Sequence, residues 1–288
     1  MKQRAAWMLC WLAVMLAWAP AVSAQGPGGV RKQVEASMRV TGAITIATDG
    51  SVEAVDLDTP EKLPKGIAAF VGQNIAGWRF EPVVVDGVPH RALTRVSALL
   101  VGKTIGGGQM SVSIRGADFS DDTVLPEAER IAARQMKPPG YPTSAAEEGV
   151  QGTVYLLVKV ARDGTVGDVS TEQVNLRFVA SEPQMNRHRD RLARAAMAAA
   201  RGWTFAPPTA GEQASQPHWI VRVPVDFNFT GLLPYGEWQV YVPGPRTRPD
   251  WAPDEDAPGF SPDALAEGGI RLAGGHRGPK LLTPLDGA

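Results

Sequence analysis

Two stretches of the chain, about 37–101 and 138–230, carry apolar and polar residues in alternation on either side of an Asp-Gly pair. The pair is Asp49-Gly50 in the first stretch and Asp163-Gly164 in the second. Alternation predicts strands with one buried face, and Asp-Gly between two such runs predicts a tight turn. Each stretch is therefore predicted to begin with a β-hairpin.

A predicted helix, an aromatic motif and a final strand follow each hairpin. The first helix covers 67–75, where apolar residues recur at helical spacing. The second covers 192–200 and is rich in alanine, the best helix former. Both helices lead into the pattern Trp-x-Phe-x-Pro, which starts at Trp78 in one stretch and at Trp203 in the other. The predicted closing strands are 92–101 and 219–229.

This internal repeat predicts two units of the same design. A helix packed on one face of a short antiparallel sheet buries the apolar face of both. We therefore predict an α+β fold in which each unit combines a hairpin and a later strand with one helix. The predicted boundaries are a signal peptide at 1–24, a flexible leader at 25–36, a first unit at 37–120, a linker with a short helix at 121–137, a second unit at 138–230, and a Gly/Pro-rich, mostly disordered tail at 231–288.

The N-terminus has the pattern of a secretory signal. Lys2 and Arg4 precede an apolar stretch, and Val22-Ser23-Ala24 places small residues where a signal peptidase cleaves. We expect cleavage after Ala24 and a periplasmic protein; the alternative is an uncleaved helix that anchors the chain in the inner membrane, facing the periplasm. Cys10 is the only cysteine, so a cleaved chain forms no disulfide and no cysteine-ligated metal site.

Charge and motifs exclude several classes of function. The net charge of −1 gives no electrostatic argument for a nucleic-acid partner. None of the four histidines is spaced from another as metal ligands are, and the nucleophile elbow and phosphate-binding loop patterns are absent from the sequence. We therefore predict a protein that is not an enzyme and uses no cofactor or metal.

The second unit resembles the C-terminal domain of the TonB family. The matching residues, in the family's order, are Pro139-Gly140-Tyr141-Pro142, Gly149 to Val154, Asp163-Gly164-Thr165-Val166, the alanine-rich helix, Trp203 to Pro207, and Val223-Pro224-Val225-Asp226-Phe227. The first unit resembles the same family through Gly42, Asp49-Gly50 and Trp78 to Pro82. It lacks the Tyr-Pro motif, so we interpret it as a degenerate copy.

The resemblance implies an energy transducer for transport across the cell envelope. In that family the C-terminal domain pairs with a short extended segment of an outer-membrane transporter. A membrane helix and a long Pro-rich spacer connect the domain to a proton-driven motor. Here the apolar N-terminus looks cleavable and no such spacer precedes the first unit, so we expect peptide binding without direct force transmission. The alternative is a membrane-anchored transducer with an uncleaved helix.

The predicted partner site is the last strand of the second unit, because the family uses this sheet edge. Pro224 favours an edge position, since proline has no N–H to donate to a neighbouring strand. Arg222 and Asp226 fall on one face, where they would give sequence preference. The predicted partner-binding residues are Trp219, Ile220, Val221, Arg222, Val223, Val225, Asp226, Phe227, Tyr141 and Pro142.

Other interpretations of these residues stay open. The strand 219–229 is instead covered by the tail or by the other unit if the chain is a structural envelope protein without a peptide site. Tyr141-Pro142 either fixes the entry of the chain into the second unit or contacts the partner. Trp203 and Phe205 are predicted to pack the helix end against the sheet. Assembly into a homo-oligomer is left open, and a membrane contact is expected only with an uncleaved N-terminus.

Overall fold

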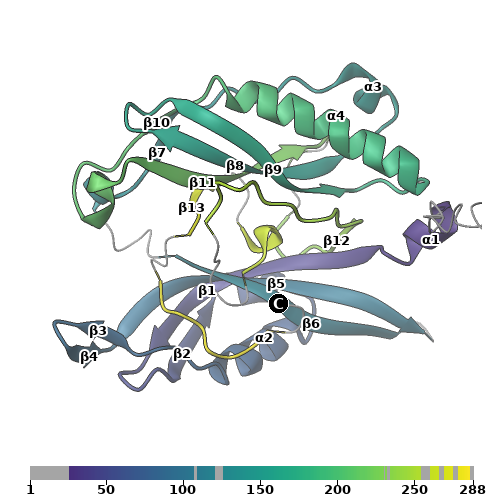
Figure 1. Cartoon of the computed structure of the whole chain (residues 1–288). Coiled ribbons are helices and arrows are strands. Elements are labelled where there is room, and N and C mark those ends of the chain that lie inside the picture. The colour runs from purple at the N-terminus through teal and green to yellow at the C-terminus, as the bar shows by residue number, and fades with distance from the viewer. Residues whose placement is uncertain are drawn as a thin grey trace, which may run out of the picture.

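The structure, a computed structural model, describes residues 26–106, 109–120, 126–229, 231, 234–253, 260–265, 269–274 and 278–285. The predicted signal peptide, with Cys10, lies outside these residues. Helices and sheets are both present, which confirms the predicted α+β fold. Two sheets face one another, with helix α4 (Glu182–Ala200) outside one and helix α2 (Ile67–Ala76) outside the other (Figure 1).

The first sheet has five strands and is built mainly from the N-terminal part of the chain. Its order is β12 (Gln239–Tyr241), β1 (Glu35–Ile46), β5 (Ala92–Gly106) and β6 (Gln109–Ser120), and β2 (Val52–Leu57) pairs with the second half of β1. All these pairs are antiparallel. Val71 and Ile75 of α2 are fully buried in the first core, which lies between this sheet and α2.

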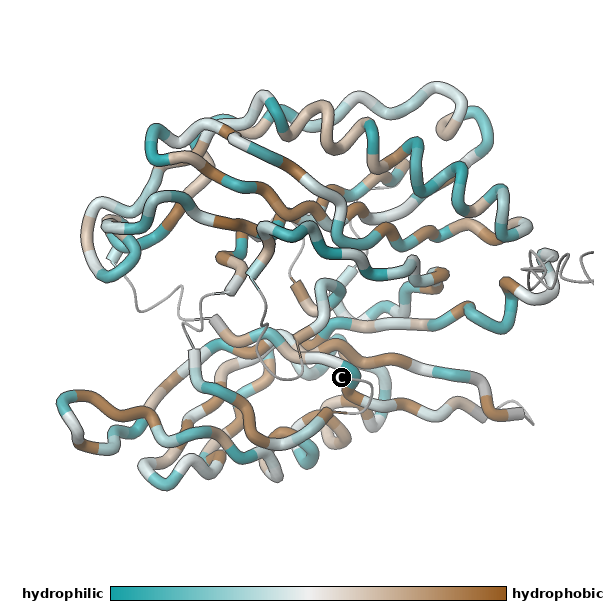
Figure 2. Tube along the Cα trace, viewed as in Figure 1, coloured by the Kyte–Doolittle hydropathy of each residue, from teal (hydrophilic) through white to brown (hydrophobic). Residues whose placement is uncertain are grey.

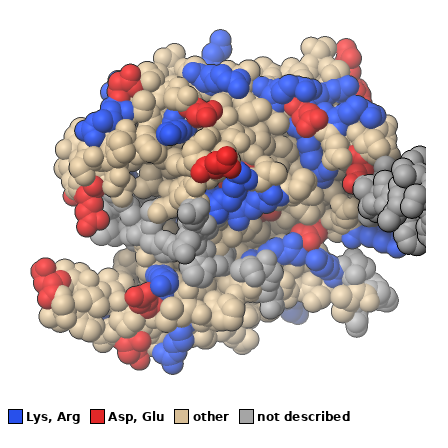
Figure 3. Space-filling model, viewed as in Figure 1, with Lys and Arg blue, Asp and Glu red and all other residues tan. Residues whose placement is uncertain are grey.

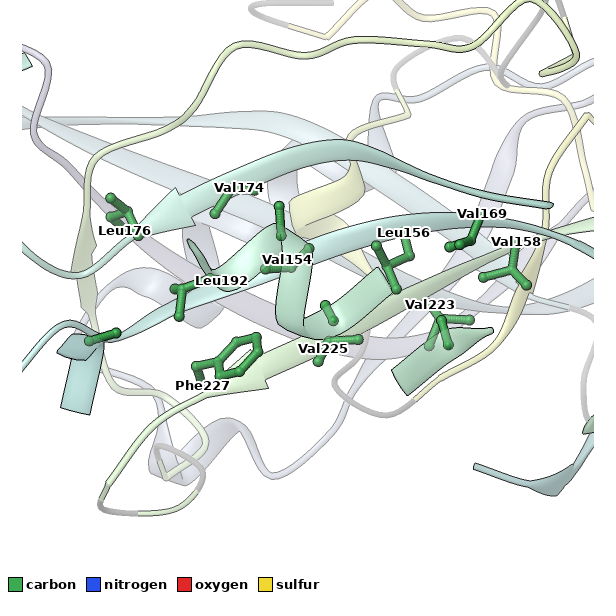
Figure 4. Close-up of a cluster of buried hydrophobic side chains, with 14 of the residues drawn as sticks. Val154, Leu156, Val158, Val169, Val174, Leu176, Leu192, Val223, Val225 and Phe227 are labelled. Atoms are coloured by element: carbon green, nitrogen blue, oxygen red, sulfur yellow. The ribbon is translucent and has the colours of Figure 1, made fainter. Parts of the chain in front are cut away.

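The second sheet has four strands. Its order is β13 (Arg271–Leu272), β11 (His218–Phe227), β8 (Gly152–Ala161) and β9 (Val166–Leu176). Alternate side chains of the three long strands meet Leu192 of α4 in one apolar cluster (Figure 4). The hydropathy trace shows hydrophobic residues recurring along the strands of both sheets, whereas α4 is largely hydrophilic (Figure 2). The helix thus buries only a narrow stripe against its sheet.

The Asp-Gly turn and the Trp-x-Phe-x-Pro motif contact each other in the same way in both halves of the chain. The N–H of Phe80 donates to the carbonyl of Gly50, and the N–H of Phe205 donates to that of Gly164, at 2.8 Å in each case. Trp203 and Phe205 are buried in the core beneath α4, as predicted. The motif therefore joins the helix end to the hairpin turn.

Several short elements of the described residues lie outside these two sheets. They are α1 (Pro27–Arg31), β3 (Val83–Val85), β4 (Val88–His90), β7 (Ala132–Gln135), α3 (Thr143–Glu147), β10 (Thr204–Ala206) and four 3-10 turns at Pro60–Lys62, Glu127–Glu129, Glu212–Ser215 and Pro262–Ala264. The structure differs here from two expectations. The predicted flexible leader contains α1, because Val30 is buried in the core between the second sheet and α4. In the predicted linker, Ala132–Gln135 is a strand rather than a helix, because it pairs with β10.

The tail differs from the predicted disorder wherever it is described. Its first part runs between the two sheets and pairs with strands of both, and its last described residues lie on the α2 side of the first sheet (Figure 1). The composition is rich in Gly and Pro, but several of the apolar residues spaced along the tail are buried. The buried residues of the described tail are Tyr241, Val242, Pro262, Ala264, Leu265, Ala273, Leu281 and Leu285.

Candidate functional site

Strand β11, which holds most of the predicted partner-binding residues, separates two environments. Val221, Val223, Val225 and Phe227 point into the core beneath α4 (Figure 4). The intervening side chains point toward the tail and the first sheet, where Ile220 packs in a separate apolar cluster. One margin of β11 pairs with β8 along its whole length, from His218 to Phe227.

The other margin of β11 is covered only in part, and by the chain's own tail. Val221 lies opposite Leu272 and Arg222 opposite Arg271 in the pairing with β13. The N–H of Ala273 extends this pairing by donating to the carbonyl of Ile220 at 2.7 Å. From Val223 to Phe227, no strand among the described residues pairs with β11 on this side. The tail therefore covers the first part of the predicted site and leaves the second part unpaired.

The Arg222 side chain is committed to an internal ion pair. Its guanidinium donates to both carboxylate oxygens of Glu172, at 2.7 and 3.1 Å, and lies 4.5 Å from the centre of the Phe260 ring. Only 2% of Arg222 is exposed, and Glu172 is fully buried. Arg246 of the tail bonds the same carboxylate at 2.6 Å. Arg222 thus holds the tail, rather than offering a charge to a partner.

The Asp226 side chain, on the same face, is likewise engaged. It accepts from Arg177 at 2.7 Å and from the hydroxyl of Thr153 at 2.8 Å. Trp219 is buried as well, and its indole N–H donates to the carbonyl of Gln213 at 3.0 Å. What β11 can offer a partner is therefore its main chain more than its polar side chains.

Tyr141 and Pro142 lie beside the far end of β11. The Tyr141 hydroxyl donates to the carbonyl of Val150 at 2.5 Å, and its ring meets Phe227 edge-on and stacks on Phe229 at 4.8 Å. Burial raises the pKa of the Tyr141 phenol. Pro142 precedes the first turn of α3. These contacts favour a role in fixing the chain's entry, although Phe229 stays half exposed next to the strand end.

A buried carboxyl from the tail, Asp263, was not found by sequence reasoning. It accepts from the Tyr241 hydroxyl at 3.2 Å and is also hydrogen-bonded to Tyr155 and Asn175. Burial raises the pKa of Asp263, despite the hydrogen bonds from the two tyrosines. The carboxyl lines a cavity of about 250 Å³ between the two sheets. Nothing in the local sequence around Asp263 distinguishes it from a solvated tail residue.

In the part of the chain that the structure describes, neither the charges nor the metal-ligating side chains indicate a further site. On the face shown in Figure 3, acidic side chains lie among the basic ones. Within the described ranges, no three His, Cys, Asp or Glu side chains are grouped as a metal ion would require. None of the helices in those ranges has both the length and the hydrophobicity to cross a bilayer.

Comparisons with known proteins support the TonB C-terminal family that the motifs resemble. A stretch of 97 residues is 42% identical to "Protein TonB" of Xanthomonas campestris pv. campestris, both in strain B100 and in a second strain. This stretch is 34% of the chain and covers 37% of the length of each curated relative. No protein-family model matches the chain.

Among solved structures, the chain is similar to the solution NMR structure of the Pseudomonas aeruginosa TonB C-terminal domain. The identity is 23% and the TM-score 0.24, over 36% of this chain and 90% of that one.

Proposed function

We propose that this chain is a periplasmic, non-enzymatic protein of the TonB type, which binds an extended segment of an outer-membrane transporter as an added strand beside β11. The 42% identity to Protein TonB supports the class of protein. Because the matched stretch covers 37% of that relative, the partner and the role in transport belong to the proposal.

The observation that carries the proposal is the margin of β11 from Val223 to Phe227, where no described strand is paired. An added strand gains affinity from main-chain hydrogen bonds and requires little of the partner's sequence. Because Arg222 and Asp226 are engaged internally, preference comes from the strand end. There Phe229 is 50% exposed and stacked on Tyr141, so an apolar partner side chain has a ring to pack on.

Two alternatives concern the tail and the N-terminus. The tail pairs with β1, β11 and the Arg79–Phe80 segment, which favours a structural envelope protein if no peptide binds. An anchored energy transducer requires that the N-terminal segment stays on the protein. N-terminal sequencing of the protein from cells decides this point, because a first residue of Gln25 excludes the anchor.

Replacing Asp226 by proline tests the binding mode. Main-chain groups alternate between the two sides of a strand, so the Asp226 N–H points to the same side as the Ile220 carbonyl that β13 uses. Asp226→Pro removes this donor, and one lost hydrogen bond is expected to weaken binding about fivefold. The measurement is fluorescence anisotropy with a labelled peptide that copies the periplasmic N-terminal segment of a TonB-dependent transporter.

The matched control is Asp226→Asn, which removes the charge and keeps the N–H. We expect Asp226→Asn to retain most of the affinity that Asp226→Pro loses. Equal affinities for the two variants and the unchanged chain would contradict strand addition at this margin, even if the peptide binds elsewhere.

A further inference from the structure

On the margin of β11 away from β8, the part paired with β13 and the unpaired part differ in the main-chain groups that they offer. The groups of Ile220 point to this side, so those of Arg222, Pro224 and Asp226 do so by alternation. Pro224 has no N–H, which leaves Asp226 as the one donor between Val223 and Phe227. A partner that forms a full ladder therefore needs the groups of Ile220 and Arg222, and β13 occupies them.

The pairing that occupies these groups is short. β13 consists of Arg271 and Leu272, whereas the opposite margin of β11 is paired with β8 from His218 to Phe227. Each hydrogen bond adds only modestly to stability, because the groups bond to water when they separate. Packing adds to these bonds, since Leu272 lies partly buried against the core beneath α4 and Ala273 lies in a small cluster with Leu157 and Ile220. A longer strand from a partner would make more bonds than β13 does.

An ion pair and two flanking anchors keep β13 near its site. Arg271 lies 2.6 Å from the carboxylate of Asp118 on β6, so β13 also touches the first sheet. Before β13, Asp263 is held by Tyr241; after it, Leu281 is buried in the first core. These anchors do not depend on the pairing with β11. A detached β13 would stay tethered, at an effective concentration on the order of millimolar.

We propose that β13 is a resident strand that regulates the peptide site: it blocks Ile220 to Arg222 at rest, and it leaves when a partner segment pairs along the whole margin of β11. The inference rests on the proposed function, because it assigns regulation to the same site. Competition follows from geometry, since one margin of a strand holds one neighbour at a time. The tail thereby sets a threshold of affinity that a partner must exceed.

A reversible covalent lock tests this proposal. Val221 and Leu272 lie opposite each other in the ladder and alternate with the hydrogen-bonded positions, a spacing that suits a disulfide. In the Val221→Cys/Leu272→Cys variant of the full chain, we expect oxidation to weaken binding of the labelled transporter peptide at least about tenfold, the equivalent of two lost hydrogen bonds. Reduction should restore it.

A second variant loosens β13 instead. Ala273→Pro removes the N–H that donates to Ile220 and should tighten peptide binding about fivefold. The matched control is Leu282→Pro, which removes the tail N–H that donates to the carbonyl of Arg79 at 2.7 Å and leaves β13 intact. Amide hydrogen exchange at Arg222 reports the release of β13 without any partner, and it should accelerate in Ala273→Pro but not in Leu282→Pro.

The outcomes separate the two proposals. If the oxidised and reduced forms bind the peptide equally well, β13 does not regulate the site, and peptide binding itself still stands. If no form binds the peptide, including Ala273→Pro with accelerated exchange at Arg222, both the proposed function and the regulation are wrong. Loss of binding on oxidation, with gain in Ala273→Pro, supports regulation by β13.

Discussion

Single glycines explain why two separate motifs recur together along the chain. Gly164 has a φ of +84°, and a Cβ at this position would lie 2.1 Å from the carbonyl oxygen of Phe205. Gly50 has a φ of +82°, and its Cβ would lie 2.0 Å from the carbonyl oxygen of Phe80. Only glycine combines this backbone conformation with so close an approach. The Asp-Gly turn and the Trp-x-Phe-x-Pro motif are therefore two halves of one contact.

Replacing Gly164 by alanine should lower the free energy of unfolding by about 3 kcal/mol, because left-handed backbone costs a residue with a side chain about 1–3 kcal/mol and the clash with Phe205 adds to it. Gly149→Ala is the matched control in the same unit. Gly149 has a φ of +68° with nothing within 4 Å of an added Cβ, so we expect a loss of about 1 kcal/mol. Urea denaturation measures both. Equal losses would show that the Phe205 contact is not needed.

Asp263 makes the stability of the chain depend on pH. Burial raises the pKa of this carboxyl above 3.8 in the folded state, so folding favours its protonated form. Its contribution to stability is complete below pH 3.8 and is lost as the pH rises through the raised folded pKa. Other carboxyls of the chain, such as Asp58, have lowered pKa values and the opposite sign, so a variant is needed to isolate Asp263.

Compared with the unchanged chain, the Asp263→Asn variant should gain stability as the pH rises from acid to neutral. The reason is that the amide stays neutral while the native carboxyl ionises. The measurement is the difference in unfolding free energy between Asp263→Asn and the unchanged chain, from urea denaturation between pH 4 and pH 8. We expect this difference to shift in favour of the variant as the pH rises. The exposed Asp250 gives the control, Asp250→Asn. A difference that is constant with pH would contradict a buried, titrating carboxyl.

At the scale of elements, alternation and turn residues were sufficient for the three long strands of the second sheet. β8, β9 and β11 coincide closely with the runs predicted around Asp163-Gly164 and at 219–229, because one face of each strand is buried and the period of two is visible. The same pattern could not give β13, since a strand of two residues has no period. Its place is set by the margin of β11 and by Asp118, both distant in sequence.

Local propensity also failed where a distant strand decided the structure. Ala132–Gln135 was predicted within a short helix, but it pairs with Thr204–Ala206, and tertiary pairing overrides a weak helical preference. The candidate site was affected in the same way. The sequence placed Arg222 and Asp226 on one face, yet their partners, Glu172 and Arg177, could not be predicted because they come from another strand and the segment after it.

At the scale of the whole molecule, the tail belongs to both halves. It pairs with β1 through Gln239–Tyr241, with β11 through β13, and with Arg79 through Leu282. Leu281, in the tail, is 1% exposed and lies in the core of the first sheet. The core between the first sheet and α2 is therefore completed by residues of the tail.

Replacing Leu281 by alanine should lower the free energy of unfolding by about 2–5 kcal/mol, the usual cost of a cavity left by a buried leucine. The neighbouring Leu282 is 55% exposed, so Leu282→Ala should change stability by less than about 0.5 kcal/mol. Thermal and urea denaturation measure both variants. Similar effects of the two substitutions would mean that the tail is not part of the first core.

Pro224 gives the margin of β11 a fixed landmark. Any strand that replaces β13 meets a missing donor at this position, wherever its own side chains happen to fall. If the incoming strand shifts by two residues, a different carbonyl of that strand lies opposite Pro224 and lacks a donor. Each alignment therefore leaves a different main-chain group of the incoming strand without a hydrogen bond. The backbone of this protein can in this way discriminate between alignments of a bound segment without any contribution from side chains.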